Sequence, residues 1–278
     1  MTDQSQDPRI GTRIGEWTVE SLIGAGGMGD VYRAIGDDGR AVALKLVKSD
    51  FAREETFRRR FVREANIAQT VKHPNVVSVV ATGELDGLPY MAQEFVAGLS
   101  LEQRLQRDRQ LDVPTTVGIC SDVAAGLEAL WAAGMVHRDV KPGNILIDES
   151  GRAHITDFGL AKDTQGSLLT LPGQALGSLD YMSPEQVQGE PVSASSDIYA
   201  LGCVIYECVC GKPPFGHVRG TRVMWAHLQD DPPDPLSRNP DLPRAFGDAV
   251  LEALRKEPAE RPATAGDYAR MLADSAGG

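Results

Sequence analysis

The stretch 137–159, which reads HRDVKPGNILIDESGRAHITDFG, constrains the fold and chemistry of this chain more than any other. Its first part places Asp139 and Lys141 directly before Pro142 and Gly143. Because proline and glycine interrupt regular helix, an irregular loop must present the two charged side chains.

Two short apolar runs follow this loop. Residues 145–147 and 154–156 predict two strands, and residues 148–151 predict the turn between them. The β-hairpin would bring four polar side chains to one end, namely Asp139, Lys141, Asn144 and Asp157. Because hard oxygen ligands suit Mg²⁺ beside phosphate oxygens, the stretch predicts a site for a metal-bound phosphate.

Length and charge limit the architecture and the partners. At 278 residues the chain exceeds one average domain, which predicts one large domain or two lobes that share a cleft. A net charge of -11 argues against a general surface for nucleic acid or anionic membrane. We therefore expect no nucleic-acid partner.

Three of the four cysteines lie in one apolar run, IYALGCVIYECVCG, at Cys203, Cys208 and Cys210. The run is short and carries Glu207, which predicts a buried helix and no membrane segment. A metal site built on Cys208, Cys210 and His217 would lack a second ligand pair, so we expect buried, reduced thiols. Residues 1–8 are too polar for a signal peptide, and the cytoplasm is the expected compartment.

The N-terminal part predicts a glycine-rich turn between strands. Residues 1–13 are expected to be a disordered tail, and WTVESLIGAGGMGDVYRAIG then predicts strand, turn and strand, with a third strand at RAVALKLV. The turn's backbone could lie close over a ligand because it is rich in glycine, at Gly24, Gly26, Gly27 and Gly29. A dinucleotide-binding fingerprint would need a helix straight after the glycines, whereas Val31-Tyr32-Arg33 continues as strand, which argues against a Rossmann fold.

Lys45 lies inside the apolar strand AVALKLV, where an amine is unfavourable unless it meets an anion. The segment 54–71 predicts a helix whose apolar stripe is Phe57, Phe61, Ala65 and Ala68. Glu64 borders that stripe and is the candidate partner of Lys45. The alternative, that Lys45 extends to solvent from an edge strand and Glu64 is a surface residue, stays open at this point.

Several motifs occur in the order of the protein kinase family: IGAGGMGDVY, VALK, the helical Glu64, HRDVKPGN, DFG, SPE, DIYALG and the late Arg261. The resemblance covers about residues 16–272, and GGMGDVY with FRRRFVREA is most similar to bacterial eukaryotic-like (Hanks-type) serine/threonine kinases. It implies an α+β, bilobal fold. The N-lobe, residues 14–94, would hold an antiparallel sheet and one main helix, the C-lobe, residues 95–273, would be mostly helical, and residues 274–278 would be a tail.

The resemblance also implies roles. Asp139 would accept the proton of the substrate hydroxyl, and Lys141 would neutralise the moving phosphoryl group. Lys45, paired with Glu64, would hold the ATP phosphates. The metal ligands would be Asn144 and Asp157, with Mg²⁺ as the ion and Mn²⁺ as an alternative.

Further residues would contact the nucleotide. The glycine-rich turn would cover its phosphates with Ile23, Gly24, Ala25, Gly26, Gly27, Met28, Gly29 and Val31. The segment YMAQEFVAG resembles the hinge between lobes, where Glu94 and Val96 would offer backbone hydrogen bonds to adenine and Gln93 would be the gatekeeper. The adenine would lie between apolar side chains of Val31, Ala43 and Leu146.

The second half is expected to be helical. Residues 114–134 predict a helix whose apolar face is Val117, Ser121, Ala124, Leu127 and Trp131. On a buried helix at 196–210, Asp197 resembles the family's anchor beneath the catalytic loop, with an N-cap as the alternative. Glu185 and Arg261 would form a buried structural pair. A Pro-rich loop from Asp231 and two final helices would complete the domain.

Between Gly159 and Ser183 the chain resembles an activation segment. Thr170 is the first candidate for phosphorylation, followed by Thr164, Ser167 and Ser178, the last at a position where the family usually has threonine. Arg138 would receive the phosphate because guanidinium pairs bidentately with it.

The predicted function is that of a non-specific serine/threonine protein kinase that uses ATP, phosphorylates protein Ser/Thr hydroxyls and autophosphorylates, with self-association for transfer between copies. One alternative is a catalytically weak pseudokinase that acts as a nucleotide-binding scaffold, which the complete set of Lys45, Glu64, Asp139, Asn144 and Asp157 disfavours. Another is a small-molecule phosphotransferase, disfavoured by SLDYMSPE, which resembles a peptide-binding loop.

Overall fold

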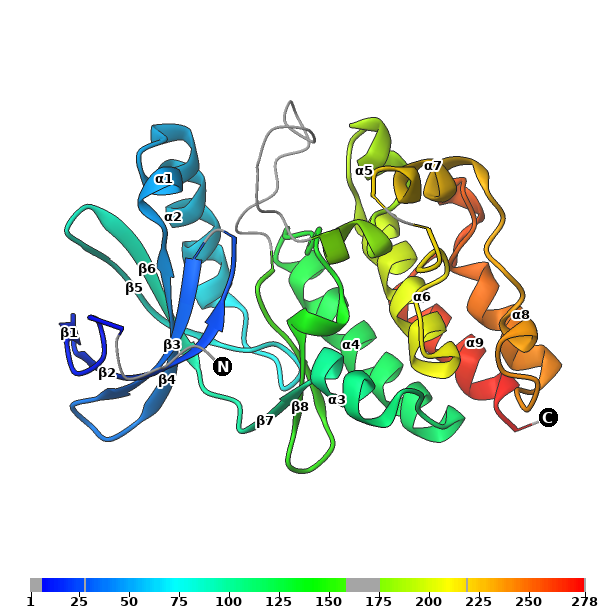
Figure 1. The fold of residues 1–278 in the computed structure, drawn as a ribbon, viewed down its shortest axis with the longest axis horizontal. Coiled ribbons are helices and arrows are strands. Elements are labelled where there is room, and N and C mark those ends of the chain that lie inside the picture. The colour runs from blue at the N-terminus through cyan, green and yellow to red at the C-terminus, as the bar shows by residue number, and fades with distance from the viewer. Residues whose placement is uncertain (1–6, 28, 159–175, 219, 278) are drawn as a thin grey trace. The chain divides into compact units, whose positions relative to one another are not determined.

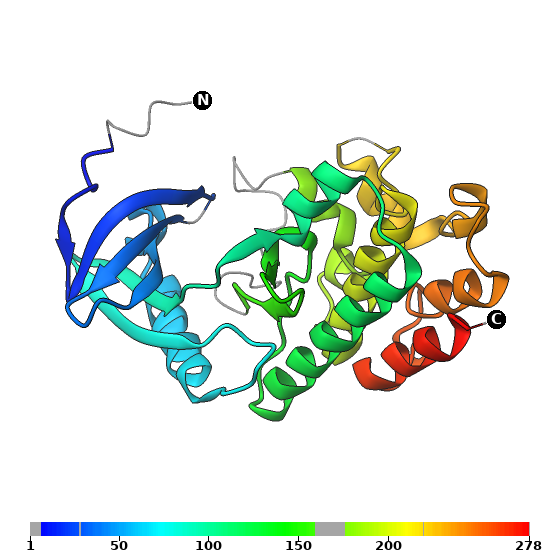
Figure 2. The ribbon, with the colours of Figure 1, turned by 90° about the horizontal axis from the view of Figure 1, so that it is seen from below.

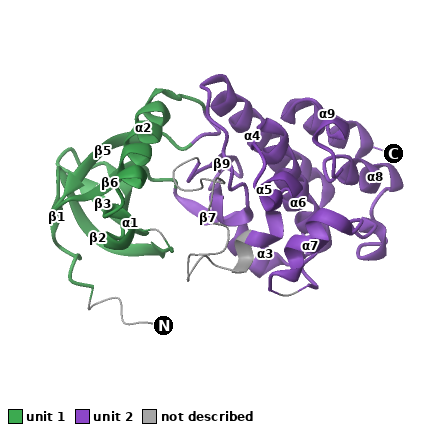
Figure 3. Cartoon of the chain, turned by 90° about the horizontal axis from the view of Figure 1, so that it is seen from above, with its two compact units in different colours: residues 1–73, 77–96 green, residues 74–76, 97–278 purple. Residues whose placement is uncertain are grey.

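The structure is a computed structural model that describes residues 7–27, 29–158, 176–218 and 220–277, without the side chains of 176–178. The chain divides into two compact units (Figure 3). Unit 1 comprises residues 1–73 and 77–96, and unit 2 comprises residues 74–76 and 97–278. The division after Val96 lies two residues beyond the predicted one after Glu94.

Unit 1 is built on a six-stranded antiparallel sheet with strand order β1-β2-β3-β4-β6-β5 (Figure 1). The strands are β1 Arg13–Ile14, β2 Trp17–Ala25, β3 Gly29–Gly36, β4 Ala41–Val47, β5 Val79–Leu85 and β6 Leu88–Glu94. Alternate residues of the inner strands enter one apolar cluster, which includes Trp17, Val19, Tyr32, Ala34, Val42 and Leu44. The period of two along each strand therefore sets which face forms the core.

Strand β4 is an interior strand of this sheet. Its Lys45 pairs in register with Val31 of β3 on one side and with Met91 of β6 on the other. The alternative that Lys45 extends from an edge strand is therefore wrong.

Two helices complete unit 1, α1 at Ser49–Ala52 and α2 at Glu55–Thr70. The second agrees with the helix predicted over 54–71. Phe61, Ala65 and Ala68 are its buried residues, whereas Phe57 is only half-buried.

The N-terminal segment corrects one prediction. Within the predicted disordered tail 1–13, residues 8–11 form turns and Arg13 begins β1, which pairs with β2. Ile14 is fully buried in the apolar cluster of the sheet. This apolar anchor and the hydrogen bonds of Asp7 and Arg9 to Tyr32 order the polar residues between them.

Unit 2 begins with a small sheet of order β7-β8-β9, formed by β7 Gly98–Ser100, β8 Ile145–Asp148 and β9 Ala153–Ile155. The antiparallel β8–β9 pair confirms the predicted hairpin. The helices of unit 2 are α3 Leu101–Asp108, α4 Val113–Ala132, α5 Pro184–Gln188, α6 Ala194–Cys210, α7 Arg222–Gln229, α8 Arg244–Glu252 and α9 Ala265–Ser275. Helix α9 packs along α4 (Figure 2) and extends into the predicted tail 274–278. The predicted antiparallel sheet and helical second half are confirmed.

The buried face of α4 differs from the predicted one. Ser121 is exposed, and Val117 and Trp131 are half-buried. The helix instead buries Thr116, Ile119, Cys120, Val123, Ala124, Gly126, Leu127 and Leu130. Because α6, α9 and β9 all pack against α4, its buried surface is wider than one stripe and is displaced from the predicted face.

Helix α6 is buried along nearly its whole length, as the apolar run predicted. All four cysteines are buried and free. Among the described residues, no helix has both the length and the apolar character to cross a membrane.

Glu185 and Arg261 form the predicted buried pair. The two guanidinium nitrogens of Arg261 contact the two carboxylate oxygens of Glu185 at 2.8 and 2.9 Å, and Ser196 donates a third hydrogen bond to this carboxylate. Burial alone would raise the pKa of Glu185, but the hydrogen bonds from Arg261 and Ser196 lower it. The pair joins the segment before α6 to the segment before α9.

Candidate active site

The loop 137–144 is anchored by hydrogen bonds to a buried carboxylate on α6. Asp197 accepts hydrogen bonds from the backbone amides of His137 and Arg138, each at 2.8 Å. Nε1 of Trp131 on α4 donates a third, at 2.9 Å. The N-cap of α6 is Ser193, so the alternative that Asp197 is a simple N-cap is wrong. The donors are those predicted around His137 and Arg138, with Trp131 in addition.

Arg138 has a strained backbone at the centre of this loop. Its φ is 64°, in the left-handed region that non-glycine residues rarely adopt. Besides the bond from its amide to Asp197, its carbonyl accepts a hydrogen bond from Nε2 of Gln186 at 3.0 Å. Both sides of the residue are therefore held by other elements, which is how such strain persists at functional sites.

The buried side chain of His137 makes two hydrogen bonds that hold the loop. Its Nδ1 accepts a hydrogen bond from the amide of Asp139 at 3.2 Å, so its Nε2 donates to the carbonyl of Thr156 at 3.1 Å. Burial lowers the pKa of His137, which keeps the imidazole neutral in this tautomer. The ring thus links the loop to the strand that precedes Asp157.

Asp139 lies at the centre of the charged group. Nζ of Lys141 is 2.9 Å from its Oδ2. Nδ2 of Asn144 donates to the Asp139 carbonyl at 2.8 Å and to Oδ2 at 3.1 Å. The structure therefore brings together three of the four polar residues predicted to meet at the end of the hairpin.

Asn144 and Asp157 are linked through the backbone. The amide of Thr156 donates to the carbonyl of Asn144 at 3.0 Å, which places Asp157 at the same end of the hairpin. Asp157 also has a left-handed backbone, with φ at 58°.

This donor set fits a divalent cation that also binds phosphate. Because Nδ2 of Asn144 donates to Asp139, its amide oxygen remains available as a hard ligand. The carboxylate of Asp157, at the same end of the hairpin, is the second candidate ligand. The described residues contain no group of three or more His, Cys, Asp and Glu side chains that could enclose a metal. Mg²⁺ usually takes one or two carboxylates and completes its shell with substrate phosphates and water.

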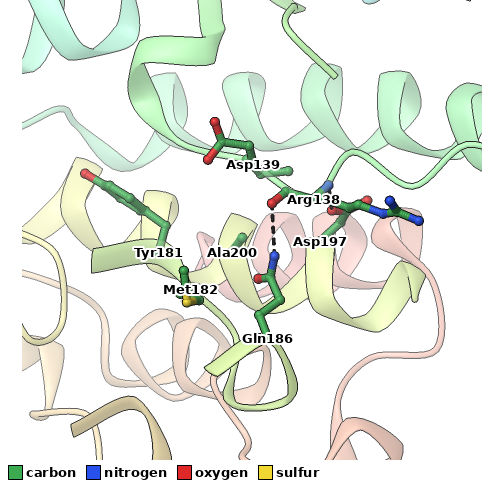
Figure 4. A pocket seen from close by; sticks show the side chains of 8 residues that line it. Arg138, Asp139, Tyr181, Met182, Gln186, Asp197 and Ala200 are labelled. Atoms are coloured by element: carbon green, nitrogen blue, oxygen red, sulfur yellow. Dashed lines mark hydrogen bonds between the residues drawn. The ribbon is translucent and has the colours of Figure 1, made fainter. Parts of the chain in front are cut away.

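A small pocket adjoins Asp139 (Figure 4). Eight residues line it, namely Arg138, Asp139, Val140, Tyr181, Met182, Gln186, Asp197 and Ala200. Asp139 and Arg138 lie on one side and Tyr181, Met182 and Gln186 on the other. The hydroxyl of Tyr181 donates to Glu207 on α6, and burial raises the pKa of Glu207 to about 7. The pocket thus places the side chains of Tyr181, Met182 and Gln186 across from the carboxylate of Asp139.

Unit 1 carries the predicted glycine-rich turn between β2 and β3. The amide of Gly26 donates to the carbonyl of Gly29 at 3.0 Å, and a Cβ on Gly29 would lie 2.4 Å from the carbonyl oxygen of Leu46. Glycine is therefore required at position 29, because a side chain there would clash with the backbone of the paired strand β4. Ile23 at the edge of the turn is 47% exposed, and Met28 lies outside the described residues.

The remaining predicted residues are distributed between the units. Unit 1 contains Ala43, Lys45, Glu64, Glu94 and Val96, and unit 2 contains Leu146. The amide of Glu94 donates to the carbonyl of Ser78 at 2.9 Å. Thr170, Thr164, Ser167, Gly159 and the side chain of Ser178 lie outside the described residues.

Reasoning from sequence missed three parts of the site. These are the Nε1 donor of Trp131, the imidazole links of His137 and the side-chain hydrogen bond of Gln186. The position of His137 beside Arg138 and Asp139 was a signal that could have identified its role.

The chain is similar to known proteins over nearly its whole length. The family described as "Protein kinase domain" matches residues 17–271. Among the relatives, serine/threonine-protein kinase PknH of Mycobacterium bovis is 39% identical over 270 residues, and PknE of Mycobacterium tuberculosis is 38% identical over 270 residues. These matches cover 97% and 95% of this chain but 45% and 47% of the two relatives, so the chain spans about half their length.

A solved structure of the Mycobacterium tuberculosis PknI kinase domain superimposes with a TM-score of 0.78 and 30% identity, covering 96% of this chain and 98% of that one. The named relatives give no support to the alternative of a pseudokinase.

Proposed function

This chain belongs to the protein kinase family, and we propose that it transfers the γ-phosphoryl group of ATP to serine and threonine hydroxyls of proteins. The observation that carries the proposal is the position of Asp139. It lies beside a pocket, in contact with Lys141 and Asn144, on a loop that Asp197 holds rigid. A carboxylate held in this way can orient a hydroxyl, and phosphoryl transfer depends mainly on orientation and electrostatics.

Each residue of this group then has a role. Asp139 orients the substrate hydroxyl and accepts its proton as the new oxygen–phosphorus bond forms and ADP leaves with the electrons of the broken bond. Lys141, whose ammonium contacts Asp139, neutralises negative charge on the transferred group. Asn144 has two proposed functions, since its nitrogen donates to Asp139 and its oxygen would be a ligand of the metal.

Protein kinases use ATP with a divalent metal, and we propose that the metal is Mg²⁺, held by Asn144 and Asp157. When bound, the ion neutralises charge on the phosphates. Mn²⁺ prefers the same oxygen ligands and is the alternative ion.

Unit 1 contributes the other nucleotide-binding groups in this proposal. The glycine-rich turn from Ile23 to Val31 covers the phosphates, and Lys45, paired with Glu64, binds two of them. The position of Lys45 on an interior strand supports this role, because an amine there needs an anion. Ala43, Glu94 and Val96 are the adenine contacts proposed within this unit.

Regulation is proposed to follow from the activation segment. Autophosphorylation of Thr170, by transfer between two copies of the chain, would create a phosphate for Arg138. The cytoplasm is the proposed compartment, which the four buried free thiols support.

Transfer from ATP labelled in its γ-phosphate tests the function. With Mg²⁺ and a basic protein such as a histone, we expect label on serine and threonine of the protein. Label confined to tyrosine, or to small alcohols added in place of the protein, would contradict the proposal. Peptide mapping of the chain after incubation with ATP tests the regulatory proposal. If it found no phosphate at Thr170, that proposal would be contradicted and the proposed kinase activity would not.

A further inference from the structure

The N-terminal segment 7–12 is tied to the strand that follows the glycine-rich turn. The hydroxyl of Tyr32 on β3 donates to Oδ2 of Asp7 at 2.8 Å and accepts a hydrogen bond from Nη1 of Arg9 at 3.1 Å. The Arg9 guanidinium also lies over the Tyr32 ring, 5.9 Å from its centre. Tyr32 is only 1% exposed, so residues of the N-terminal segment satisfy a buried hydroxyl on β3.

A second set of contacts continues from Arg9 to the turn itself. Nη1 of Arg9 lies 3.6 Å from Oδ2 of Asp30, and Nζ of Lys48 lies 3.6 Å from Oδ1 of the same carboxylate. The Lys48 ammonium also donates to the carbonyl of Gly26 at 2.6 Å. Asp30 therefore bridges two cations, of which one belongs to the N-terminal segment and the other holds the backbone of the turn.

This restraint acts on a turn that is rich in glycine. Glycine loses more conformational freedom on ordering than any other residue, and the turn contains Gly24, Gly26, Gly27 and Gly29. A hydrogen bond from an ammonium is stronger than one between neutral groups. The Asp30 side chain is 20% exposed, whereas those of Lys48 and Arg9 are 42% and 38% exposed, so the carboxylate is the member of the group that solvent screens least. The hydrogen bond from Lys48 restrains the backbone of Gly26 before any ligand binds. It therefore reduces the conformational entropy that the turn would lose on binding a ligand.

We propose that Asp7, Arg9, Asp30 and Lys48, with the hydroxyl of Tyr32, form a relay that positions the glycine-rich turn for the nucleotide phosphates. These are positioning residues, which act through the backbone of Gly26. The inference rests on the proposed function, in which this turn covers the phosphates of ATP.

Lys48→Met tests the relay without nucleotide. Amide hydrogen exchange of residues 24–31 should become faster by about three- to tenfold, because one charge-assisted hydrogen bond restrains the turn. Asp30→Asn, which removes the charge between the two cations, should have the same direction of effect, and Lys48→Arg should preserve the original rate.

Arg40→Met is the matched control. Arg40 also lies in unit 1 and pairs with an aspartate, Asp38, at 3.8 Å, but it belongs to the turn between β3 and β4. Exchange in residues 24–31 should be unaffected by this change. Equal exchange in Lys48→Met and Arg40→Met would overturn the inference, whatever the chain does with nucleotides.

Nucleotide binding provides the second measurement. Lys48→Met should weaken ATP binding and raise KM for ATP by about three- to tenfold, with kcat at saturating ATP within about twofold of the original. Adenosine, which has no phosphates, should bind with unchanged affinity. A parallel loss of ATP and adenosine affinity would overturn the relay, whereas failure of the unaltered chain to bind ATP would contradict the proposed function and leave the exchange result to decide the inference.

Discussion

The amide of Arg138 donates a hydrogen bond to the buried carboxylate of Asp197 at 2.8 Å, from a backbone that lies in the left-handed region. Residues held in such a conformation are strained by about 1–3 kcal/mol and keep it only where their surroundings impose it. Here the surroundings are Asp197 on the amide side and Gln186 on the carbonyl side. The shape of the loop that presents Asp139 is therefore set by α6 and α5 as well as by its own sequence.

Asp197→Asn should destabilise the chain and slow its catalysis. Asparagine has one acceptor oxygen in place of two, so one backbone amide of the loop would face an NH₂ group. We expect the free energy of unfolding to fall by about 2–4 kcal/mol and kcat to fall more than about tenfold. Trp131→Phe, which removes only one of the three donors, should lower the free energy of unfolding by about 1–2 kcal/mol. Chemical denaturation of the two variants checks this order, and the reverse order would contradict the role of Asp197 as anchor.

Arg261→Met should leave the Glu185 carboxylate buried without its main partner. Breaking a buried pair in this way lowers the free energy of unfolding by about 3–5 kcal/mol. The exposed pair of Arg244 and Asp234 offers a control, because its side chains are 57% and 42% exposed. Arg244→Met should change the free energy of unfolding by less than about 1 kcal/mol. Equal denaturation midpoints for the two variants would show that the Glu185–Arg261 pair does not stabilise unit 2.

Glu207→Gln should change the dependence of stability on pH. Burial raises the pKa of Glu207 in the folded chain to about 7, above its ordinary value of 4.5. The folded chain then binds this proton more tightly than the unfolded one, so stability falls as pH rises from about 4.5 to 7. Glutamine still accepts from the Tyr181 hydroxyl but carries no charge.

We therefore expect the Gln variant to be more stable than the original chain at pH 8, by up to about 3 kcal/mol, and equally stable at pH 4. Glu190→Gln, at an exposed position, should leave the curve unchanged. Denaturation across this pH range measures the difference, and parallel curves for Glu207→Gln and the original chain would contradict the prediction.

The sequence predicted those parts of the site that depend on short segments. Asp139, Lys141 and Asn144 lie within six residues, so the turn-forming Pro142 and Gly143 and the hairpin were enough to bring them together. The hydrogen bonds of Trp131 to Asp197 and of Gln186 to Arg138 join residues 66 and 48 positions apart. Such contacts depend on how helices pack, which local patterns do not encode.

Two other differences have the same origin. The apolar stripe predicted for α4 included Ser121, because a helix covered by several elements has no single apolar face. Residues 7–13 were predicted to be disordered from their polar composition. They are ordered because Ile14 enters the core and because Tyr32, far along the chain, needs partners for its hydroxyl.

Asp139→Asn tests the central claim most directly. The change keeps the size of the side chain but removes the carboxylate that accepts the proton, and Asp241→Asn, at an exposed site, is the matched control. With Mg²⁺ and ATP, the account predicts that Asp139→Asn transfers phosphate to protein about 10²–10⁴-fold more slowly than the original chain, with unchanged folding, while Asp241→Asn matches the original rate. Equal transfer by Asp139→Asn and the original chain would contradict it.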